Sequence, residues 1–342
     1  MDKPTVHDIA KEAGVSLATV DRVLNSRPGV REQTVDRVRQ AVERLGYVRD
    51  INAANLARQR RYRFVFLLPE GKSQFLDSLE NAVAEASSGL TDWRCELEVM
   101  HATFRDPPAL AEAERRILQT QTDGVAIMGH ETPLIRDMVG RLKARGLTVV
   151  ALVTDQPHSE RDHFIGIDNL AAGRTAGVLM GRFLAGNTGR VAVIVNTTQS
   201  RDMIDRRAGF DEVLATRFPN LVALPSLEGR DDRERVACVL EACLERQGPL
   251  VGIYCVGAGT RGVTRVIRER GLADKLVVVA HELTPHCRKA LEDGTIDVVI
   301  TQNVGHIVRS AVRVLRAKCD NAEIIESQEK IRIEIVIREN LS

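Results

Sequence analysis

The sequence lacks the residue patterns that mark several large classes of protein. Its six cysteines stand at positions 95, 238, 243, 255, 287 and 319, so none forms a Cys-x-x-Cys pair and no Cys/His group has zinc-site spacing. No apolar run is long enough to span a bilayer, and the polar N-terminus argues against a secretory signal. We therefore expect a cytoplasmic protein with no metal and no membrane partner, whose cysteines are mostly small buried hydrophobes.

Motifs of catalysis are also missing. There is no Gly-x-Ser-x-Gly nucleophile elbow and no phosphate-binding loop of the Walker type. Residues 257–262 form a glycine-rich stretch after an apolar run, which resembles a dinucleotide-binding turn, but no acid follows on an obvious second strand. A nucleotide-binding enzyme is therefore kept as an alternative, while the main expectation is a protein without catalytic residues or cofactors.

The first 25 residues predict two short helices joined by a tight turn. Thr5 can cap the first helix, and Gly14 can end it in the left-handed conformation. Ser16 can cap the second helix, in which apolar residues recur at inward spacing up to Leu24. A third helix is predicted over about residues 31–45. Helices this short must pack on one another, and the pattern is that of a helix-turn-helix, whose second helix can lie in a DNA major groove.

Positive charge is concentrated on the same segment. Residues 1–63 carry 13 Lys and Arg against 8 Asp and Glu, whereas the remaining residues carry 35 against 39. The net charge of +1 therefore combines +5 at the N-terminus with −4 elsewhere. Phosphate contacts need such an excess. An ordinary basic surface would look the same, but together with the helix-turn-helix pattern the charge indicates double-stranded DNA as a partner.

From residue 63 onward, continuous apolar runs alternate with helical patterns. Such runs predict parallel sheets that are covered on both faces, in a doubly wound order that repeats twice. Ligands of these sheets bind at the carboxyl ends of the strands, and two lobes would place those ends around one cleft. The predicted fold is α/β, with two doubly wound parallel-sheet lobes preceded by an all-α headpiece. The strands are expected at residues 64–69, 124–129, 148–153, 190–195, 250–256, 276–280, 298–301 and 331–337.

The whole chain resembles the LacI/GalR family of bacterial transcription factors. The resemblance rests on Asp8-Ile9-Ala10, Gly14-Val15-Ser16, Thr19-Val20, Arg22-Val23-Leu24-Asn25, Gly46-Tyr47, the alanine-and-leucine stretch at 52–58, and Gly166-Ile167-Asp168-Asn169 followed by Gly173. It implies a headpiece at 1–50, a hinge helix and linker at 51–62, and an effector-binding and dimerisation domain at 63–342. Lobe 1 would comprise about 63–162 and 294–323, and lobe 2 about 163–293 and 324–342.

The same resemblance implies a function. The protein would bind a palindromic operator as a homodimer and change its DNA affinity when a sugar, polyol or sugar acid binds between the lobes. Repression relieved by the effector is the commoner mode in the family, and corepression or activation stays open. A periplasmic carrier is the other alternative, but it would lack the basic headpiece.

The resemblance also implies which residues contact DNA. Leu17, Ala18 and Arg22 would read base edges, because arginine can hold guanine through two hydrogen bonds. Leu56 would wedge into the minor groove, with a core contact to the larger domain as the alternative. Asp21 stands where the family has a serine, and it either accepts a bond from a cytosine amine or is angled away. The full set is Thr5, Ser16, Leu17, Ala18, Thr19, Arg22, Asn25, Ala53, Asn55 and Leu56.

Effector contacts are expected in the loops that follow the strands. Arg206 would bond ligand hydroxyls or a carboxylate, with a surface helix arginine as the alternative. The full set is Ser73, Gln74, Phe75, Asp155, Asp168, Arg206, Glu282 and Gln302. Val256-Gly257 stand where the family has Asn-Asp, and His281 replaces a usual aromatic residue. One polar contact is therefore missing, which favours a less usual effector such as a polyol, a sugar acid or a modified sugar.

Overall fold

The computed structural model describes residues 4–24, 28–47, 60–71, 73–89, 94–257 and 259–341. The chain divides into two compact units, Met1–Arg60 and Arg61–Ser342. Four residues expected to contact DNA lie outside the described residues, namely Asn25, Ala53, Asn55 and Leu56. None of the helices in the described ranges combines the length and apolar composition that crossing a bilayer requires.

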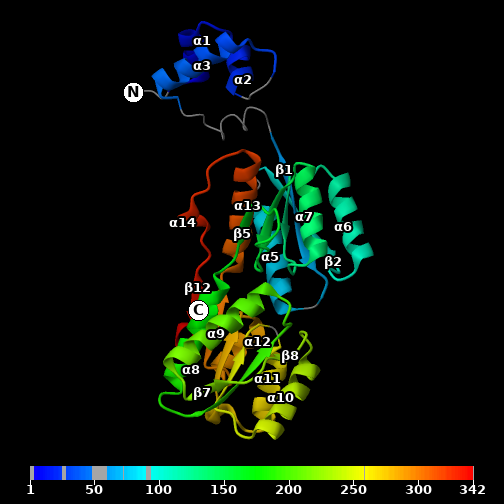
Figure 1. Cartoon of the computed structure of the whole chain (residues 1–342), viewed down its shortest axis with the longest axis vertical. Helices are drawn as coiled ribbons and strands as arrows, with labels where there is room; N and C mark the ends of the chain where they lie inside the picture. The colour runs from blue at the N-terminus through cyan, green and yellow to red at the C-terminus, as the bar shows by residue number, and fades with distance from the viewer. Residues whose placement is uncertain are drawn as a thin grey trace. The chain divides into compact units, whose positions relative to one another are not determined.

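The smaller unit is a three-helix bundle, seen in Figure 1 as α1 (Val6–Ala13), α2 (Leu17–Leu24) and α3 (Glu32–Leu45). Helix α1 begins with a capping box, in which the Thr5 hydroxyl accepts from the Asp8 amide and the Asp8 carboxylate accepts from the Thr5 amide at 2.8 Å. It ends at Gly14, whose φ of 60° is left-handed, as predicted. The buried core is small and consists of Ile9, Ala13, Val20, Val38 and Ala41.

Arg37 joins the third helix to the end of the first. Its Nη2 donates to the carbonyl oxygen of Ala13 at 2.6 Å and to that of Gly14 at 3.0 Å, and its Nε donates to Ala13 at 3.1 Å. The last carbonyls of a helix have no partner within the helix, so the guanidinium satisfies them and fixes the turn between α1 and α2. This contact supplements a core of few side chains, and no sequence motif pointed to it.

The first sheet of the larger unit is parallel, with strand order β2-β1-β3-β4-β5. Helices α5 (Gln74–Gly89) and α13 (Val304–Cys319) cover one face, and α6 (Pro107–Gln119) and α7 (Pro133–Ala144) cover the other. Phe64 and Phe66 face α5 and α13, whereas Val65 and Leu67 face α6 and α7, which explains the unbroken apolar run. The strands are β1 (Tyr62–Pro69), β2 (Cys95–Ala102), β3 (Gly124–Ile127), β4 (Thr148–Leu152) and β5 (His163–Ile165).

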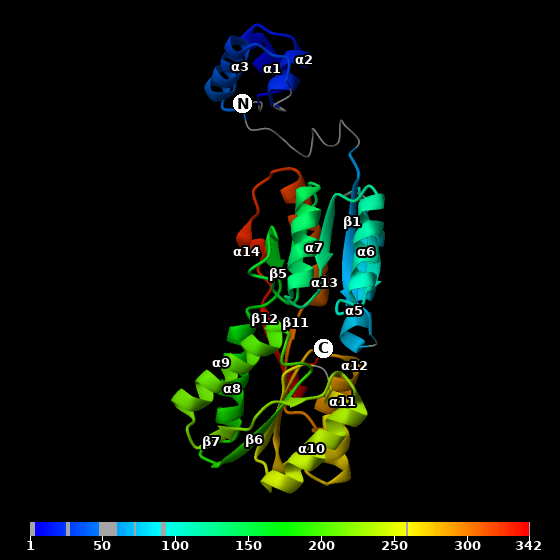
Figure 2. The same ribbon diagram turned by 45° about the vertical axis from the view of Figure 1, so that its right-hand side comes forward.

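The second sheet has the order β12-β11-β10-β9-β6-β7, and β8 also pairs with β6. Figure 2 shows α8 (Asn169–Phe183) and α9 (Arg201–Arg217) on one side, opposite α10 (Arg233–Gln247), α11 (Thr260–Glu269) and α12 (Pro285–Glu292). The strands are β6 (Gly189–Val195), β7 (Leu221–Ala223), β8 (Leu227–Glu228), β9 (Gly252–Cys255), β10 (Val277–His281), β11 (Val298–Gln302) and β12 (Ile333–Val336).

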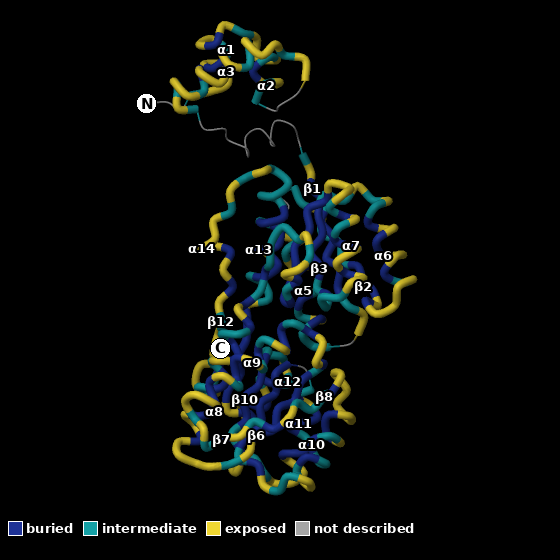
Figure 3. Tube along the Cα trace, in the orientation of Figure 1, coloured by how far each residue is buried: buried dark blue, intermediate teal, exposed yellow. Residues whose placement is uncertain are grey.

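The predicted α/β class with two doubly wound lobes is confirmed, and Figure 3 shows the buried strands running through both lobes. One pair departs from the all-parallel expectation, because β12 runs antiparallel to β11. Short helices complete the larger unit, namely α14 (Glu326–Glu329), a 3-10 turn at Ala273–Lys275 and another at Arg338–Asn340.

The chain crosses between the lobes at different residues from those expected. Strand β5 pairs with β4 in the first sheet, so residues 163–165 belong to lobe 1 and not to lobe 2. Strand β11 pairs with β10 and β12, so residues 298–302 belong to lobe 2 and not to lobe 1. The crossings therefore lie near 165–169, 302–304 and 329–333. Apolar periodicity identifies a strand but does not say which sheet it joins, and this accounts for the error.

Helices α8 and α9 pack at unusually close range. Gly173, Gly177 and Gly181 lie four residues apart on one face of α8, as expected of neighbours on a helix surface. A Cβ atom on Gly173 would collide with the carbonyl oxygen of Arg206, and one on Gly177 would lie 2.8 Å from the Cβ of Val213. The glycines therefore set how near α9 comes to α8, and with it the position of the Arg206 backbone.

We predict that Gly173→Ala destabilises the larger unit by about 1–3 kcal/mol, because the new methyl group meets backbone that cannot move freely. Gly140→Ala on α7 is the matched control, since the nearest atom to its added Cβ is 3.8 Å away. That control should be neutral or more stable by about 0.5–1 kcal/mol. Urea denaturation followed by circular dichroism measures both, and equal effects of the two variants would contradict the close-packing role.

Candidate functional site

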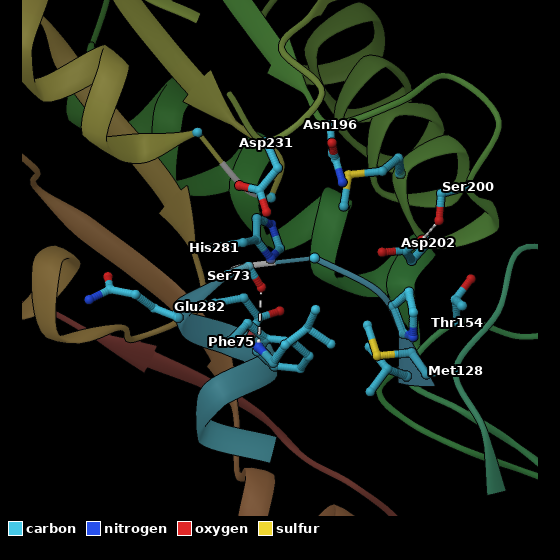
Figure 4. A pocket seen from close by; sticks show the side chains of 18 of the residues that line it. Ser73, Phe75, Met128, Thr154, Asn196, Ser200, Asp202, Asp231, His281 and Glu282 are labelled. Atoms are coloured by element: carbon cyan, nitrogen blue, oxygen red, sulfur yellow. Dashed lines mark hydrogen bonds between the residues drawn. The ribbon is translucent and has the colours of Figure 1, made fainter. Parts of the chain in front are cut away.

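A cavity of about 740 Å³ lies between the two lobes of the larger unit. Its walls come from the carboxyl ends of β1, β3 and β4 in lobe 1, and from those of β6, β8, β9 and β10 in lobe 2. Figure 4 shows Ser73, Phe75 and Met128 on one side and Asn196 and Asp231 on the other. The doubly wound topology thus brings loops from both sheets to a single concave site.

Five of the expected effector residues line this cavity, namely Ser73, Gln74, Phe75, Arg206 and Glu282. Ser73 opens α5, and its hydroxyl accepts from the amide of Leu76 at 3.2 Å. Gln302 lies behind Glu282, lines a smaller neighbouring cavity of about 240 Å³, and donates to Glu282 Oε1 at 3.0 Å. It therefore supports a cavity residue and does not face the main cavity itself.

Asp155 and Asp168 do not belong to the cavity wall, which corrects the sequence-based expectation. Asp155 forms a two-bond ion pair with Arg161, at 2.5 Å to Nε and 2.8 Å to Nη2. Asp168 caps α8 by accepting from the amide of Ala171 at 2.9 Å. The residue before Asp155, Thr154, lines the cavity, whereas the residue after Asp168, Asn169, acts only through its bond to Arg206.

Arg206 is the largest of the fully buried side chains in the described residues, with 1% of its surface exposed. Its Nε donates to Asn169 Oδ1 at 2.8 Å, its Nη1 to the Val256 carbonyl at 3.0 Å, and its Nη2 to Glu282 Oε1 at 3.1 Å. The alternative of a surface arginine is therefore wrong. The guanidinium is held by the protein on every nitrogen, so it organises the cavity floor.

Glu282 is the buried partner of this arginine. Burial raises the pKa of its carboxyl, and the opposing effect of Arg206 is smaller. Its Oε1 accepts from Arg206 and from Gln302, while its Oε2 has no hydrogen-bond partner within the described residues. The carboxylate is thus half satisfied by the protein and offers one more acceptor.

His281, Tyr254 and Phe210 form a row of contacting rings. The Nε2 of His281 lies 2.9 Å from the Tyr254 hydroxyl, and the Tyr254 ring stacks on Phe210 with centroids 4.4 Å apart. Burial and the nearby Arg206 charge hold the pKa of His281 well below its usual value, so the imidazole is neutral at pH 7. His281 lines the cavity, and its Nδ1 has no hydrogen-bond partner within the described residues.

Several cavity residues were missed by the sequence analysis. Asn196 follows β6 and could have been found as the polar residue after that apolar run. Asp202 lies in the first turn of α9, where Ser200 donates to its carboxylate, and Asp231 lies in a turn before α10. His130, Thr154 and Ser200 are further polar residues of the lining that were missed.

Backbone strain is concentrated at the cavity. Six non-glycine residues in the described ranges have positive φ, and four of them line the cavity. Such conformations cost about 1–3 kcal/mol each and persist only where the surrounding structure enforces them. Val153, Arg230, Asp231 and Glu282 are the four, with φ of 65°, 53°, 57° and 67°.

The glycine-rich stretch after β9 is explained by side-chain packing. A Cβ atom on Gly257 would collide with the Met203 side chain, and one on Gly259 would lie 2.7 Å from Val236 Cγ2. These glycines thus make room for hydrophobic neighbours of the cavity wall. The resemblance to a dinucleotide turn does not need a phosphate ligand to account for it.

Helix α2 of the smaller unit exposes one face. Leu17, Ala18, Asp21 and Arg22 are all exposed, and 42% of the Leu17 surface is accessible. Val20 is fully buried on the opposite face. An exposed leucine beside an arginine on a helix is suited to the edges of base pairs, and Asp21 shares this face because it lies four residues after Leu17.

The remaining headpiece residues expected to contact DNA, Thr5, Ser16 and Thr19, form hydrogen bonds within the headpiece. The Ser16 hydroxyl accepts from the Thr19 amide at 3.2 Å and lies 2.9 Å from the Thr19 hydroxyl. The Thr5 hydroxyl donates to Asp8 at 2.7 Å. Thr5 and Ser16 therefore cap α1 and α2, and Thr19 lies in the first turn of α2 beside Ser16. The three hydroxyl groups are at helix N-termini, where phosphates are favoured.

Each of the two units matches a known protein family. Residues 5–50 match the lacI family of bacterial regulatory proteins, and residues 64–323 match the periplasmic binding protein domain family. Catabolite control protein A of Streptococcus mutans is 28% identical over 182 residues, which is 53% of this chain and 52% of that protein. The HTH-type transcriptional regulator RegA of Clostridium saccharobutylicum is 39% identical over 84 residues, 25% of each chain. The chain thus matches about half or less of the length of these curated relatives.

Two solved structures resemble the larger unit. An ABC transporter solute-binding protein of Burkholderia graminis, in complex with D-arabinose, has a TM-score of 0.74 at 25% identity and covers 82% of this chain and 96% of that chain. GanP, a glucose-galactose binding protein of Geobacillus stearothermophilus, has a TM-score of 0.73 at 19% identity and covers 82% and 99%. The second likeness shows the shared fold alone.

We predict that Arg206→Met destabilises the larger unit by about 3–5 kcal/mol, because it leaves Glu282 buried without its cation. Arg174→Met is the matched control, since Arg174 on α8 pairs with Glu212 on α9 and both side chains are about half exposed. Loss of that exposed pair should cost about 0–1 kcal/mol. Denaturant midpoints of the two variants measure the difference, and similar losses would count against a structural ion pair.

Proposed function

We propose that this chain, which belongs to the periplasmic binding protein domain family over residues 64–323 and carries a headpiece of the lacI family of bacterial regulatory proteins at residues 5–50, is a transcriptional repressor that a small effector releases from DNA. It binds a palindromic operator as a homodimer in this proposal. The observation that carries it is the joining, in one chain, of a helix-turn-helix with an exposed reading face to a two-lobed unit with a polar cavity.

The proposal of a dimer follows from how such headpieces read DNA. One three-helix unit covers only a few base pairs, and its core is small. Two copies related by a twofold axis read two inverted half-sites, which gives the operator the same symmetry as the protein. Residues 51–62 then connect the paired headpieces to the effector domain, with residues 52–58 as the hinge helix.

The effector class in the proposal is a sugar, a polyol or a sugar acid. Neutral hydroxyl groups suit the exposed carboxylates and amides of the cavity, and the structural relative from Burkholderia graminis was solved with D-arabinose. An effector that touches both walls prefers one arrangement of the lobes, and this preference is what can change DNA affinity. The proposed site is that of a binding protein and not of an enzyme, in line with relatives that are regulators. It operates in the cytoplasm, where operator DNA is found.

We predict that selection of random DNA by the full chain yields a twofold-symmetric site. Arg22→Ala should then lose about tenfold or more in affinity for that site, since a two-bond contact to guanine contributes about 1–3 kcal/mol. Arg39→Ala removes the same charge from an exposed position on α3 and should weaken all sequences alike. Fluorescence anisotropy measures both variants, and a selected site without symmetry would contradict the dimeric repressor.

We predict that Leu56→Ala weakens binding to the selected operator much more than binding to random DNA. The physical reason is that an apolar wedge contributes only where it can unstack a particular base step. The ratio of specific to non-specific affinity at fixed salt is the measurement. An unchanged ratio would remove the wedge from the proposal and leave a core contact as the role of Leu56.

A further inference from the structure

The charges that face the interior of the cavity do not balance. Five carboxylates line it: Glu70 and Asp77 are exposed on lobe 1, and the other three, Asp202, Asp231 and Glu282, are on lobe 2. The buried guanidinium of Arg206 is paired with Glu282. Asp202 is 7% exposed, and its charge adds to the effect of burial in raising the pKa of Glu282. A buried carboxylate without a cation is costly, so the interior is suited to a positively charged guest.

The other basic residues of the lining do not supply that charge. Arg230 and Arg233 are exposed at the rim, where Glu228 and Glu234 pair with them at 3.3 Å and 3.1 Å. Arg261 is exposed in the first turn of α11. Burial lowers the pKa of the two lining histidines, so both are neutral at pH 7.

Asp231 is fixed in the cavity wall by a strained turn. The Gly229 amide donates to the Val195 carbonyl at 2.8 Å, and the Arg230 amide donates to the Asn196 carbonyl at 2.9 Å. Within the turn, the Asp232 amide donates to the Gly229 carbonyl at 3.1 Å. These bonds hold both Arg230 and Asp231 in the left-handed region. Figure 4 shows the Asp231 side chain beside His281.

The Asp231 carboxylate has no ion pair or hydrogen bond to any other described residue. The side chain is open to the cavity, yet the surrounding walls displace enough water to raise its pKa to about 6. The group is thus ionised at pH 7, and the cavity around it provides no counter-charge. A positively charged guest would supply that counter-charge.

Two further atoms point to a guest that also carries hydroxyl groups. Thr154 Oγ1 and His281 Nδ1 belong to side chains that are 4% and 1% exposed, and neither atom has a partner within the described residues. Both residues line the cavity, on opposite lobes (Figure 4). Unpaired polar atoms on both walls need hydrogen-bond partners between them.

We propose that the effector carries an amino group, which Asp231 and Asp202 hold as an ammonium ion while Thr154, His281 and Glu282 bond its hydroxyl groups. The inference rests on the proposed function and narrows the effector class to an amino sugar or an amino polyol. An ammonium ion forms charge-assisted hydrogen bonds with carboxylates and neutralises the interior. A sugar acid would instead bring another negative charge next to them.

The test uses series of sugars that differ at one group. The full chain is titrated by calorimetry with D-glucosamine, D-glucose and D-glucuronate, and with D-galactosamine, D-galactose and D-galacturonate. The amine is expected to bind about tenfold or more tightly than the neutral sugar, as a charged hydrogen bond allows, with the acid weakest. A neutral sugar or an acid that binds as well as its amine overturns the proposal, and so does the absence of any difference within both series.

Asp231→Asn tests the residue itself. Asparagine adopts the left-handed backbone readily, so the turn should persist while the charge is lost. The preference for the amine should fall to about threefold or less, as expected when an ionic hydrogen bond becomes a neutral one. Asp274→Asn is the control, because Asp274 is an exposed acid of the same lobe outside the cavity lining. A preference that survives in Asp231→Asn overturns the assignment.

The two proposals fail in different ways. Neutral sugars that bind best and also release the operator would overturn the amino group and leave the regulator intact. A selected DNA site without symmetry would contradict the dimeric repressor whatever the sugar titrations give.

Discussion

The buried contact between Arg206 and Glu282 is the constraint on which the cavity depends. A charge this deep cannot be left alone, so the elements that carry its partners must stay together. Arg206 on α9 bonds to Asn169 at the start of α8, to the Val256 carbonyl after β9 and to Glu282 after β10. The glycine face of α8 allows α9 to come close enough for these bonds. The floor of the cavity is therefore rigid before any effector arrives.

The sequence predicts this fold where side chains are buried on both sides of a strand. The run from Phe64 to Leu68 could be read because both faces of β1 are covered. Strand β2 was not predicted, because it is an edge strand in which Glu96 and Glu98 interrupt the apolar pattern. The sheet to which β11 belongs depends on pairing with distant strands, and no local pattern carries that information.

The site could be predicted only to the nearest turn. Polar residues after strands were the right signal for Ser73 and Glu282, but the signal cannot tell which residue of a loop faces inward. The left-handed Val153 turns the chain so that Thr154 enters the cavity and Asp155 reaches Arg161. The position of Asp231 depends on a similar turn, and a single sequence does not show which aspartates adopt the left-handed conformation.

The larger unit also contains a direct connection from the lobe crossing to the start of the domain. Helix α13 begins at Val304, immediately after the crossing at 302–304, and its 16 residues span about 24 Å at the rise of an α-helix. Just beyond its end, Asp320 Oδ1 accepts a hydrogen bond from the Tyr62 hydroxyl at 2.6 Å, and Tyr62 opens β1 at the end of the linker. Because a packed helix moves as one body, a shift of the lobes at the crossing would reach Tyr62 without deforming the sheet. In the proposed regulator, this helix is the element through which the cavity can act on the residues that lead to the DNA-binding unit.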